Sequence, residues 1–172
     1  GLGRNTSSCL EIKSELGNRI EILSNMFKQV YSIEFDDEYI ELQKRRFSRK
    51  NCNNVHITKC NLLKLPFPDN FFDMVLCNGV LDNISKFIKT CSSSEAQEQL
   101  ILELKRVINE NGCIVFGVEN KHGFKIRTDS NKKDDMALSK HGFSKYRSIL
   151  EDGGLTVKPY WMITSYIKPH YS

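Results

Sequence analysis

The chain has 172 residues, 40% hydrophobic and 27% charged, a composition typical of a globular domain rather than a disordered or membrane-embedded chain. Its formal net charge of +4 is too small to indicate a nucleic-acid partner, and no apolar run is long enough for a membrane-spanning helix. The six cysteines stand singly without a C-x-x-C pair, so we predict no metal site and expect reduced thiols in a cytoplasmic protein. We expect a single domain over residues 1–172.

The first half of the chain alternates strand-like runs with helical patterns. Strands are predicted at residues 8–12, 30–34 and 55–58, which are short and rich in apolar residues. The apolar residues between positions 16 and 27 recur at intervals of four, three and four, which marks one face of a helix. Asp36 or Asp37 can cap the next helix, which we expect to run to about Arg49.

The second half continues the alternation. A turn at Asn78-Gly79 follows the strand predicted at 72–77, and Ser92 with Glu95 forms a capping box for a helix that ends at Asn111-Gly112. The remaining predictions are a strand at 113–118, a polar loop at 119–138, a helix near 139–152, and strands at 155–161 and 163–168.

Apolar strands that alternate with helices favour a three-layer, doubly wound α/β domain around a mostly parallel sheet of about seven strands. In such a fold, ligands bind at the carboxyl ends of the strands, where the winding direction reverses. The residues that follow the first four predicted strands are therefore the candidates for a functional site.

Five segments in a particular order carry a resemblance to a known family. They are residues 10–18, 30–36, 65–75, 77–83 and 103–112, and the most specific is Leu65-Pro66-Phe67-Pro68-Asp69 ahead of Phe72-Asp73-Met74-Val75. Together they resemble the class I S-adenosylmethionine-dependent methyltransferases over about residues 8–160. The resemblance implies a Rossmann-like fold whose last strand is antiparallel, S-adenosylmethionine as cofactor, and methyl transfer as the reaction.

The turn after the first strand departs from the family pattern. Where the family has Glu-x-Gly-x-Gly-x-Gly, this chain has Glu11, then Lys13 and Glu15 in place of two glycines, and only Gly17 remains. A non-glycine residue held at positive φ there would carry about 1–2 kcal/mol of strain. The alternative is an ordinary strand-to-helix turn with a charged rim.

The resemblance also assigns cofactor contacts further along the chain. It implies that Glu34 accepts hydrogen bonds from the ribose hydroxyls and that Phe35 lies against the adenine. Asn61, beside Leu62, takes the place of an aspartate that bonds the adenine amino group, and its amide oxygen can still accept. Cys77 and Asn78 would lie beside the methionine moiety. The alternatives are a helix-capping or solvated acid at 34, a core aromatic at 35, a loop asparagine at 61 and a buried filler at 77.

A methyl transfer needs little protein chemistry beyond alignment and, where required, removal of a proton from the acceptor. Asp82 is the only local candidate base, with helix capping as the alternative. We expect a small-molecule or sugar-like acceptor. The resemblance implies that residues 119–138 and the aromatic end of the chain, including Tyr160 and Trp161, form a substrate lid, with an edge-strand core as the alternative for the aromatic residues.

Three other nucleotide-binding classes lack their motifs here. The chain has no G-x-G-x-x-G after the first strand for a nicotinamide cofactor and no phosphate-binding loop for a nucleoside triphosphate. The segment at Cys77-Asn78-Gly79-Val80 also differs from the Asn/Asp-Pro-Pro-Tyr/Phe of nucleic-acid amino-methyltransferases, so we do not expect nucleic acid as a partner. The remaining alternative is a methyltransferase-like module that no longer catalyses and serves in binding or assembly, with weak or no cofactor binding.

Overall fold

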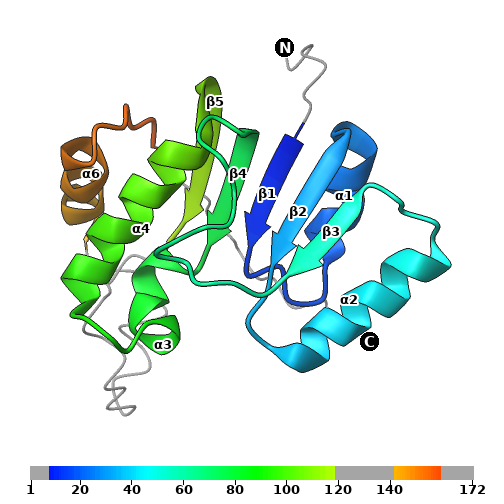
Figure 1. Cartoon of the computed structure of the whole chain (residues 1–172). Coiled ribbons are helices and arrows are strands. Elements are labelled where there is room, and N and C mark those ends of the chain that lie inside the picture. The colour runs from blue at the N-terminus through cyan, green and yellow to red at the C-terminus, as the bar shows by residue number, and fades with distance from the viewer. Residues whose placement is uncertain (1–7, 119–141, 160–172) are drawn as a thin grey trace, which may run out of the picture.

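The computed structural model describes residues 8–118 and 142–159. These residues form a parallel sheet with helices on both faces (Figure 1). The elements in chain order are β1 (Ser8–Ile12), α1 (Asn18–Met26), β2 (Gln29–Ile33), α2 (Asp37–Arg49), β3 (Val55–Thr58), β4 (Phe72–Asn78), the 3-10 helix η1 (Leu81–Asn83), α3 (Ile84–Phe87), α4 (Ser93–Val107), β5 (Ile108–Gly117) and α6 (Phe143–Asp152).

The strand order in the sheet is β3-β2-β1-β4-β5, and every pair is parallel. The chain winds outward from β1 to β3 and then returns to the other side of β1 as β4. The winding therefore reverses between β1 and β4, and the ends of these strands form the switch point where open α/β sheets bind ligands. The predicted doubly wound fold is confirmed for the five strands that the structure describes.

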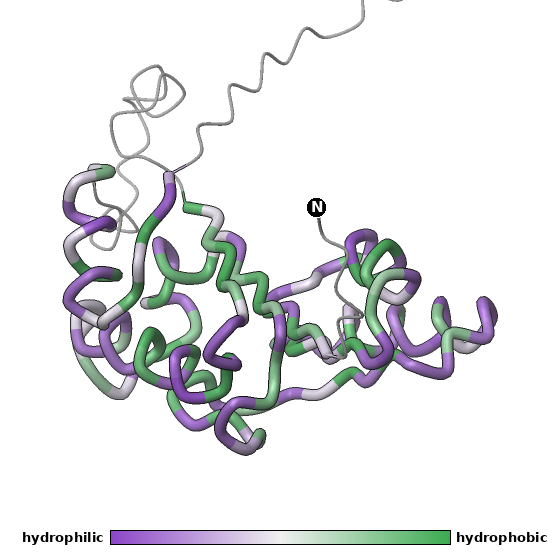
Figure 2. Tube along the Cα trace, turned by 90° about the horizontal axis from the view of Figure 1, so that it is seen from above, coloured by the Kyte–Doolittle hydropathy of each residue, from purple (hydrophilic) through white to green (hydrophobic). Residues whose placement is uncertain are grey.

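The two faces of the sheet bury separate hydrophobic clusters. On one face, Ile20 and Leu23 of α1 and Phe47 of α2 pack against Cys9 and Val30. On the other face, α4 and α6 cover β1, β4 and β5, with Leu100, Ile101, Leu104, Tyr146 and Leu150 among the buried side chains. Seen from above, hydrophobic segments run along the central strands between the two layers of helices (Figure 2). The sheet thus has apolar strands because both of its faces are covered.

The predicted helix starts are confirmed where a capping side chain defines them. The side chain of Asp36 accepts a hydrogen bond from the Glu38 N–H at the start of α2. Ser92 and Glu95 form both bonds of the capping box ahead of α4. Both caps satisfy amide groups that no helical carbonyl can reach.

The predicted end of the helix at Asn111-Gly112 is wrong. Helix α4 ends at Val107, and β5 already begins at Ile108, which pairs with Phe72 of β4. The register then shifts, since Met74 pairs with Cys113, so the residues between them form an irregular stretch. Gly112 is needed there because a Cβ atom would lie 2.7 Å from the side chain of Ile108. Pairing with β4 overrides the local stop signal.

The C-terminal predictions are tested only in part. The helix near 139–152 is confirmed as α6, with its start at Phe143, and residues 155–159 form no strand in the described structure. The rest of the predicted strands at 155–161 and 163–168, the antiparallel last strand and the predicted lid at 119–138 lie outside the described residues. None of the described helices is long and apolar enough to cross a membrane.

Candidate functional site

The turn between β1 and α1 has a left-handed backbone at every second residue. The φ angles are 61° at Lys13, 51° at Glu15 and 71° at Gly17. The Lys13 N–H bonds to the Ile33 carbonyl at 2.8 Å, and the Gly17 N–H bonds to the Ser14 carbonyl at 2.9 Å. The first two residues therefore hold a conformation that costs a side-chain-bearing residue about 1–2 kcal/mol.

Gly17 is required by space as well as by its backbone. A Cβ atom at this position would lie 3.1 Å from the ring of Phe47 and 3.2 Å from Cγ of Gln43, both on α2. Close packing of α2 against the start of α1 thus depends on the one glycine that the turn retains.

The two side chains that replace glycines pair with each other. The Lys13 Nζ atom lies 2.8 Å from a carboxylate oxygen of Glu15, and the side chains are 31% and 51% exposed. Their charges therefore offset one another at the rim of the turn.

Glu34 follows β2 and turns its carboxylate toward this turn. The side chain is buried, and one oxygen accepts the Glu15 N–H at 2.6 Å while the other accepts the Phe35 N–H at 2.8 Å. Each carboxylate oxygen has a second lone pair, so acceptor capacity remains. The end of β2 and the β1–α1 turn are thereby joined through one carboxylate.

Glu11 lies inside β1 and is fully buried. One of its oxygens accepts a hydrogen bond from Nε of Arg19 on α1, whereas Oε2 has no hydrogen-bond partner among the described residues. Burial raises the pKa of Glu11 above its ordinary value, the Arg19 guanidinium counteracts this, and the nearby charges of Glu34 and Glu15 add to the rise. A buried acceptor without a donor is suited to a cationic or hydrogen-bonding ligand group.

A cavity of about 270 Å³ opens beside the end of β2. Phe35 and Phe87, whose ring centroids are 4.7 Å apart, belong to its lining, and residues 60–62 and 88–90 complete it. Ligand pockets usually range from about 300 to 1,000 Å³, so this space suits one ring system. A hollow of about 950 Å³ along α2 is lined in the described structure by that helix and the adjoining Lys50, and we regard it as open surface.

Asn61 and Leu62 line this cavity, but they differ in exposure. Leu62 is buried, whereas Asn61 is exposed and its amide oxygen accepts the Leu63 N–H at 2.9 Å. The oxygen that was predicted to face a ligand thus also stabilises the local turn.

The end of β4 contains Cys77 and Asn78. Burial, and secondarily the charge of Asp82, raises the pKa of the Cys77 thiol to about 12, so the thiol is protonated and inert at neutral pH. The Asn78 side chain lies against Gly117 of β5, where any Cβ atom would collide with its amide oxygen. Asp82, in η1, is fully buried.

The structure therefore brings together Glu11, Lys13, Gly17, Glu34 and Phe35 around the β1–α1 turn, and it places Asn61 and Leu62 at the adjoining cavity. Cys77 and Asn78 end the neighbouring strand β4. Gln43, Gly117 and Phe87 also lie at these positions and were not predicted from the sequence. A signal for Gln43 was present, because it stands between Ile40 and Phe47 on the buried face of α2, where a polar residue needs a partner.

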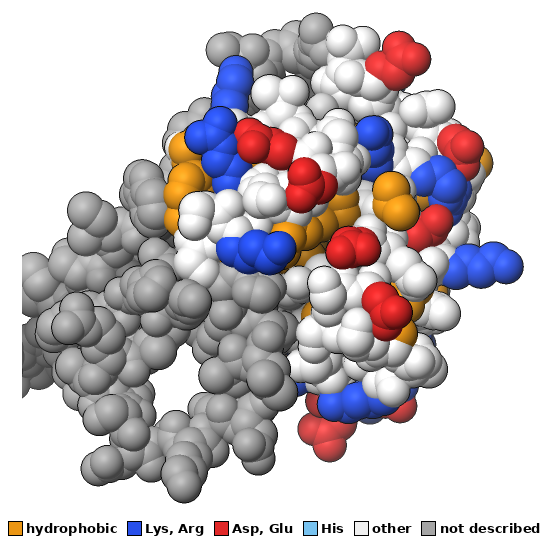
Figure 3. Space-filling model, turned by 90° about the vertical axis from the view of Figure 1, so that its left-hand side faces the viewer, with side chains coloured by type: hydrophobic (Ala, Val, Ile, Leu, Met, Phe, Trp, Pro, Cys, Tyr) orange, Lys and Arg blue, Asp and Glu red, His pale blue; other side chains and the backbone are white. Residues whose placement is uncertain are grey.

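The surface around α6 has no single charge sign. In the view of this side of the molecule, acidic and basic side chains are interspersed, with small hydrophobic areas between them (Figure 3).

The chain matches a family model described as "Methyltransferase domain" over residues 10–116, more than half of its length. It is 29% identical over 87 residues to the demethylmenaquinone methyltransferase of Staphylococcus saprophyticus, which covers 51% of this chain and 32% of that protein. It is also 26% identical over 99 residues to that of Listeria monocytogenes, covering 56% and 38%. The chain thus spans about a third of the length of these curated relatives.

Solved structures share the fold at lower identity. A SAM-dependent methyltransferase from Aquifex aeolicus superposes with a TM-score of 0.68 at 21% identity, covering 92% of this chain and 77% of that chain. The [4+2]-cyclase SpnF gives 0.68 at 16% identity, covering 89% and 52%. Because a cyclase has the same fold, the fold by itself does not define the reaction.

Proposed function

Since this chain belongs to the methyltransferase domain family, we propose that it is an S-adenosylmethionine-dependent methyltransferase acting on a small-molecule or sugar-like acceptor. The observation that supports the proposal best is the backbone of the β1–α1 turn. Lys13 and Glu15 adopt the left-handed φ angles that a glycine motif would adopt. The chain therefore keeps the backbone shape of a cofactor-binding turn although two glycines are gone.

The residues around this turn fit the cofactor chemically. The unpartnered oxygen of Glu11 suits an ammonium group, and the remaining lone pairs of the Glu34 carboxylate suit vicinal hydroxyls. The cavity beside Phe35 suits an aromatic base. The cofactor-binding residues in this proposal are Glu11, Lys13, Gly17, Glu34, Phe35, Asn61, Leu62, Cys77 and Asn78.

The cofactor supplies an activated methyl group on a sulfonium, so the protein contributes mainly binding and alignment. Glu11 and Glu34 would fix the cofactor from adjacent strands, while the rings of Phe35 and Phe87 would offer it an apolar surface in the cavity. Asp82 is the candidate base in this proposal. Because its carboxyl group is fully buried, η1 would have to move before the group could reach an acceptor.

The proposed acceptor class is supported only by the names of the relatives, and not by a contact in the structure. The curated relatives are named as demethylmenaquinone methyltransferases. For this chain we infer from those names only that the acceptor is a small molecule. A specific observation favours a second function, a binding or assembly module without catalysis. The Lys13–Glu15 ion pair places two side chains at a rim where the family pattern has bare backbone.

Isothermal calorimetry with S-adenosylmethionine tests the proposal. We expect micromolar binding by the parent chain, and we expect Glu34→Ala to lose about 2–3 kcal/mol of affinity, the range for a hydrogen bond to a charged group. The matched control is Glu98→Ala, which removes an exposed glutamate of α4 and should leave the affinity unchanged. No binding by the parent up to millimolar cofactor would favour the binding module. An unaltered affinity in Glu34→Ala would remove Glu34 from the site.

A further inference from the structure

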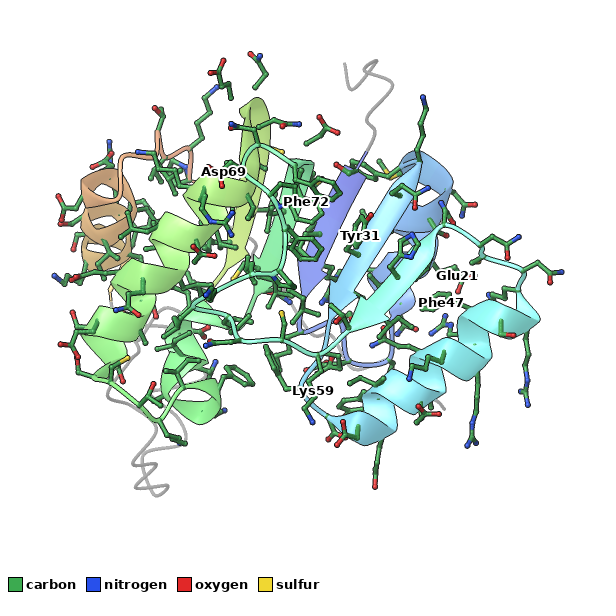
Figure 4. All side chains as sticks on the ribbon, in the orientation of Figure 1. Glu21, Tyr31, Phe47, Lys59, Asp69 and Phe72 are labelled. Carbon is green, nitrogen blue, oxygen red and sulfur yellow. The ribbon has the colours of Figure 1, made fainter. Side chains whose placement is uncertain are left out.

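A buried polar network lies directly beneath the β1–α1 turn. It joins Ser14 of the turn, Ser32 of β2 and Gln43 of α2, whose side chains are all nearly or fully buried. The two serine hydroxyls lie 2.6 Å apart, and the Ser32 hydroxyl donates to the Gln43 amide oxygen at 3.0 Å. The network lies within the face of the sheet that α1 and α2 cover. Figure 4 shows Phe47, one turn further along α2, projecting toward the same face.

The amide nitrogen of Gln43 reaches upward into the turn. It donates to the Ser14 hydroxyl at 2.8 Å and to the main-chain carbonyl of Glu15 at 2.7 Å. The N–H of the same residue, Glu15, donates to the Glu34 carboxylate at 2.6 Å. Glu15 is therefore held from both sides, by a glutamine below and by the proposed ribose acceptor beside it.

The two hydrogen bonds, from Gln43 and to Glu34, are made by Glu15, whose backbone is strained. Glu15 has a φ of 51° and Lys13 a φ of 61°, values that an L-residue leaves readily unless its surroundings hold it. A glycine would adopt them without strain. A hydrogen-bond donor fixed beneath the turn is a means of keeping the left-handed backbone in a chain that lacks the glycines.

We propose that Gln43 is a positioning residue for cofactor binding, which holds the Glu15 backbone in the left-handed conformation and so fixes the Glu34 carboxylate. The proposal rests on the proposed function, and it adds to it a residue of α2 that has no exposed surface. Gln43 acts through the turn and not by touching the cofactor.

The test compares two buried glutamines. Gln43→Met keeps the size and flexibility of the side chain but removes the donor to Glu15, while Ser14 and Ser32 keep their bond to each other. Gln97→Met is the control, because Gln97 is equally buried on α4 and donates to the Leu81 carbonyl at 2.8 Å, away from the turn. We expect Gln43→Met to weaken S-adenosylmethionine binding about tenfold and Gln97→Met to change it less than about twofold, although both lower the urea midpoint.

A second background separates positioning from general loss of structure. In the double variant Lys13→Gly with Glu15→Gly, the left-handed backbone is no longer strained, so Gln43→Met should weaken binding only about twofold to threefold. Equal losses in both backgrounds, or equal losses in Gln43→Met and Gln97→Met, would overturn the positioning role while leaving the proposed function intact. No binding by the parent and by the double-glycine variant would overturn the proposed function and this inference together.

Discussion

At the scale of single residues, the buried carboxylate of Glu11 suits ligand binding but opposes folding. Glu11 is a fully buried carboxylate in β1, and only one of its oxygens has a hydrogen-bond partner among the described residues, Arg19. A buried acceptor in this state costs folding free energy, because water solvated it in the unfolded chain. Such a cost is expected where a group is kept for a ligand and not for stability.

The pH dependence of stability should reveal this cost. Burial raises the folded-state pKa of Glu11, so between its unfolded and folded pKa values the folded protein holds a proton that the unfolded chain has released. Stability then falls as pH rises through that window. Glu11→Gln can still accept from Arg19 but has no charge to bury. We measure the unfolding free energy of both proteins by urea denaturation. We expect the value for Glu11→Gln, relative to that of the parent, to increase as the pH rises from 4.5 to 7.5.

The same substitution should act in the opposite direction on ligand binding. Glu11→Gln removes the negative charge that suits an ammonium group, so we expect it to bind S-adenosylmethionine more weakly than the parent at pH 7.5. A parallel pH dependence in parent and variant would show that Glu11 titrates as it does in the unfolded chain.

At the scale of elements, helix α4 holds the long connection between β3 and β4. The guanidinium of Arg106 donates to the carbonyls of Leu65 and Phe67 at 3.1 and 2.8 Å, and it pairs with Asp69 at 2.8 Å. Glu103, one turn earlier, accepts the Leu65 N–H and a bond from Arg106, both at 2.9 Å. Asp69 is seen beside the upper end of α4 (Figure 4). Two of the five segments that carried the family resemblance therefore contact each other directly.

Lysine in place of this arginine is expected to fail as a substitute. A single ammonium cannot donate along the several directions of a guanidinium fork, so the Leu65 and Phe67 carbonyls lose donors. We expect Arg106→Lys to lower the unfolding free energy by about 1–2 kcal/mol in urea denaturation. The control is Arg147→Lys on α6, whose exposed i,i+4 pair with Glu151 should cost less than about 0.5 kcal/mol. Equal effects of the two changes would mean that the connection is held by its apolar residues alone.

Acid should weaken the same contact. Hydrogen bonding from Arg106 lowers the pKa of Glu103, so its contribution is present above the ordinary glutamate value and is lost as pH falls through the lowered one. The difference in unfolding free energy between the parent and Arg106→Lys, measured by urea denaturation, should therefore become smaller as the pH falls.

At the scale of the whole molecule, the sheet is shared by two hydrophobic clusters that have no buried residue in common. Cys9 lies in the cluster under α1 and α2, and Cys77 lies in the cluster under α4 and α6. Both side chains are fully buried, and burial raises the pKa of each thiol to about 12. We propose that residues 1–172 form one domain, in which neither cluster is stable without the sheet that both cover.

Thiol labelling tests this proposal directly. In a cooperative domain, Cys9 and Cys77 become reactive with a thiol reagent at the same urea concentration, because both are exposed by one transition. Peptide mass spectrometry after a short labelling pulse resolves the two sites, and the exposed Cys113 serves as the control that reacts in the native protein. Labelling of Cys9 at a clearly lower urea concentration than Cys77 would show that the α1–α2 side unfolds separately.

Local patterns in the sequence were sufficient for much of the architecture. Strands β1 and β3 begin and end where their apolar runs do, and α2 and α4 begin at side-chain caps, because strand burial and helix capping depend on neighbouring residues. The order of the family segments likewise identified a methyltransferase domain, and the resemblance implied the roles of Glu11 and Glu34.

Other features depended on residues that meet only in the folded chain. The end of α4 moved from Asn111 to Val107 because β4 pairs with Ile108. Lys13 and Glu15 adopt a glycine-like backbone that their own preferences oppose, and the hydrogen bonds from Gln43 and to Glu34 that accompany it come from positions 28 and 19 residues away. The sequence by itself determined the order of strands β1 to β5 and of the long helices between them, since strand burial and helix capping are local. Only the tertiary structure decided the conformation of the turn, because strain in one segment persists when distant hydrogen bonds outweigh it.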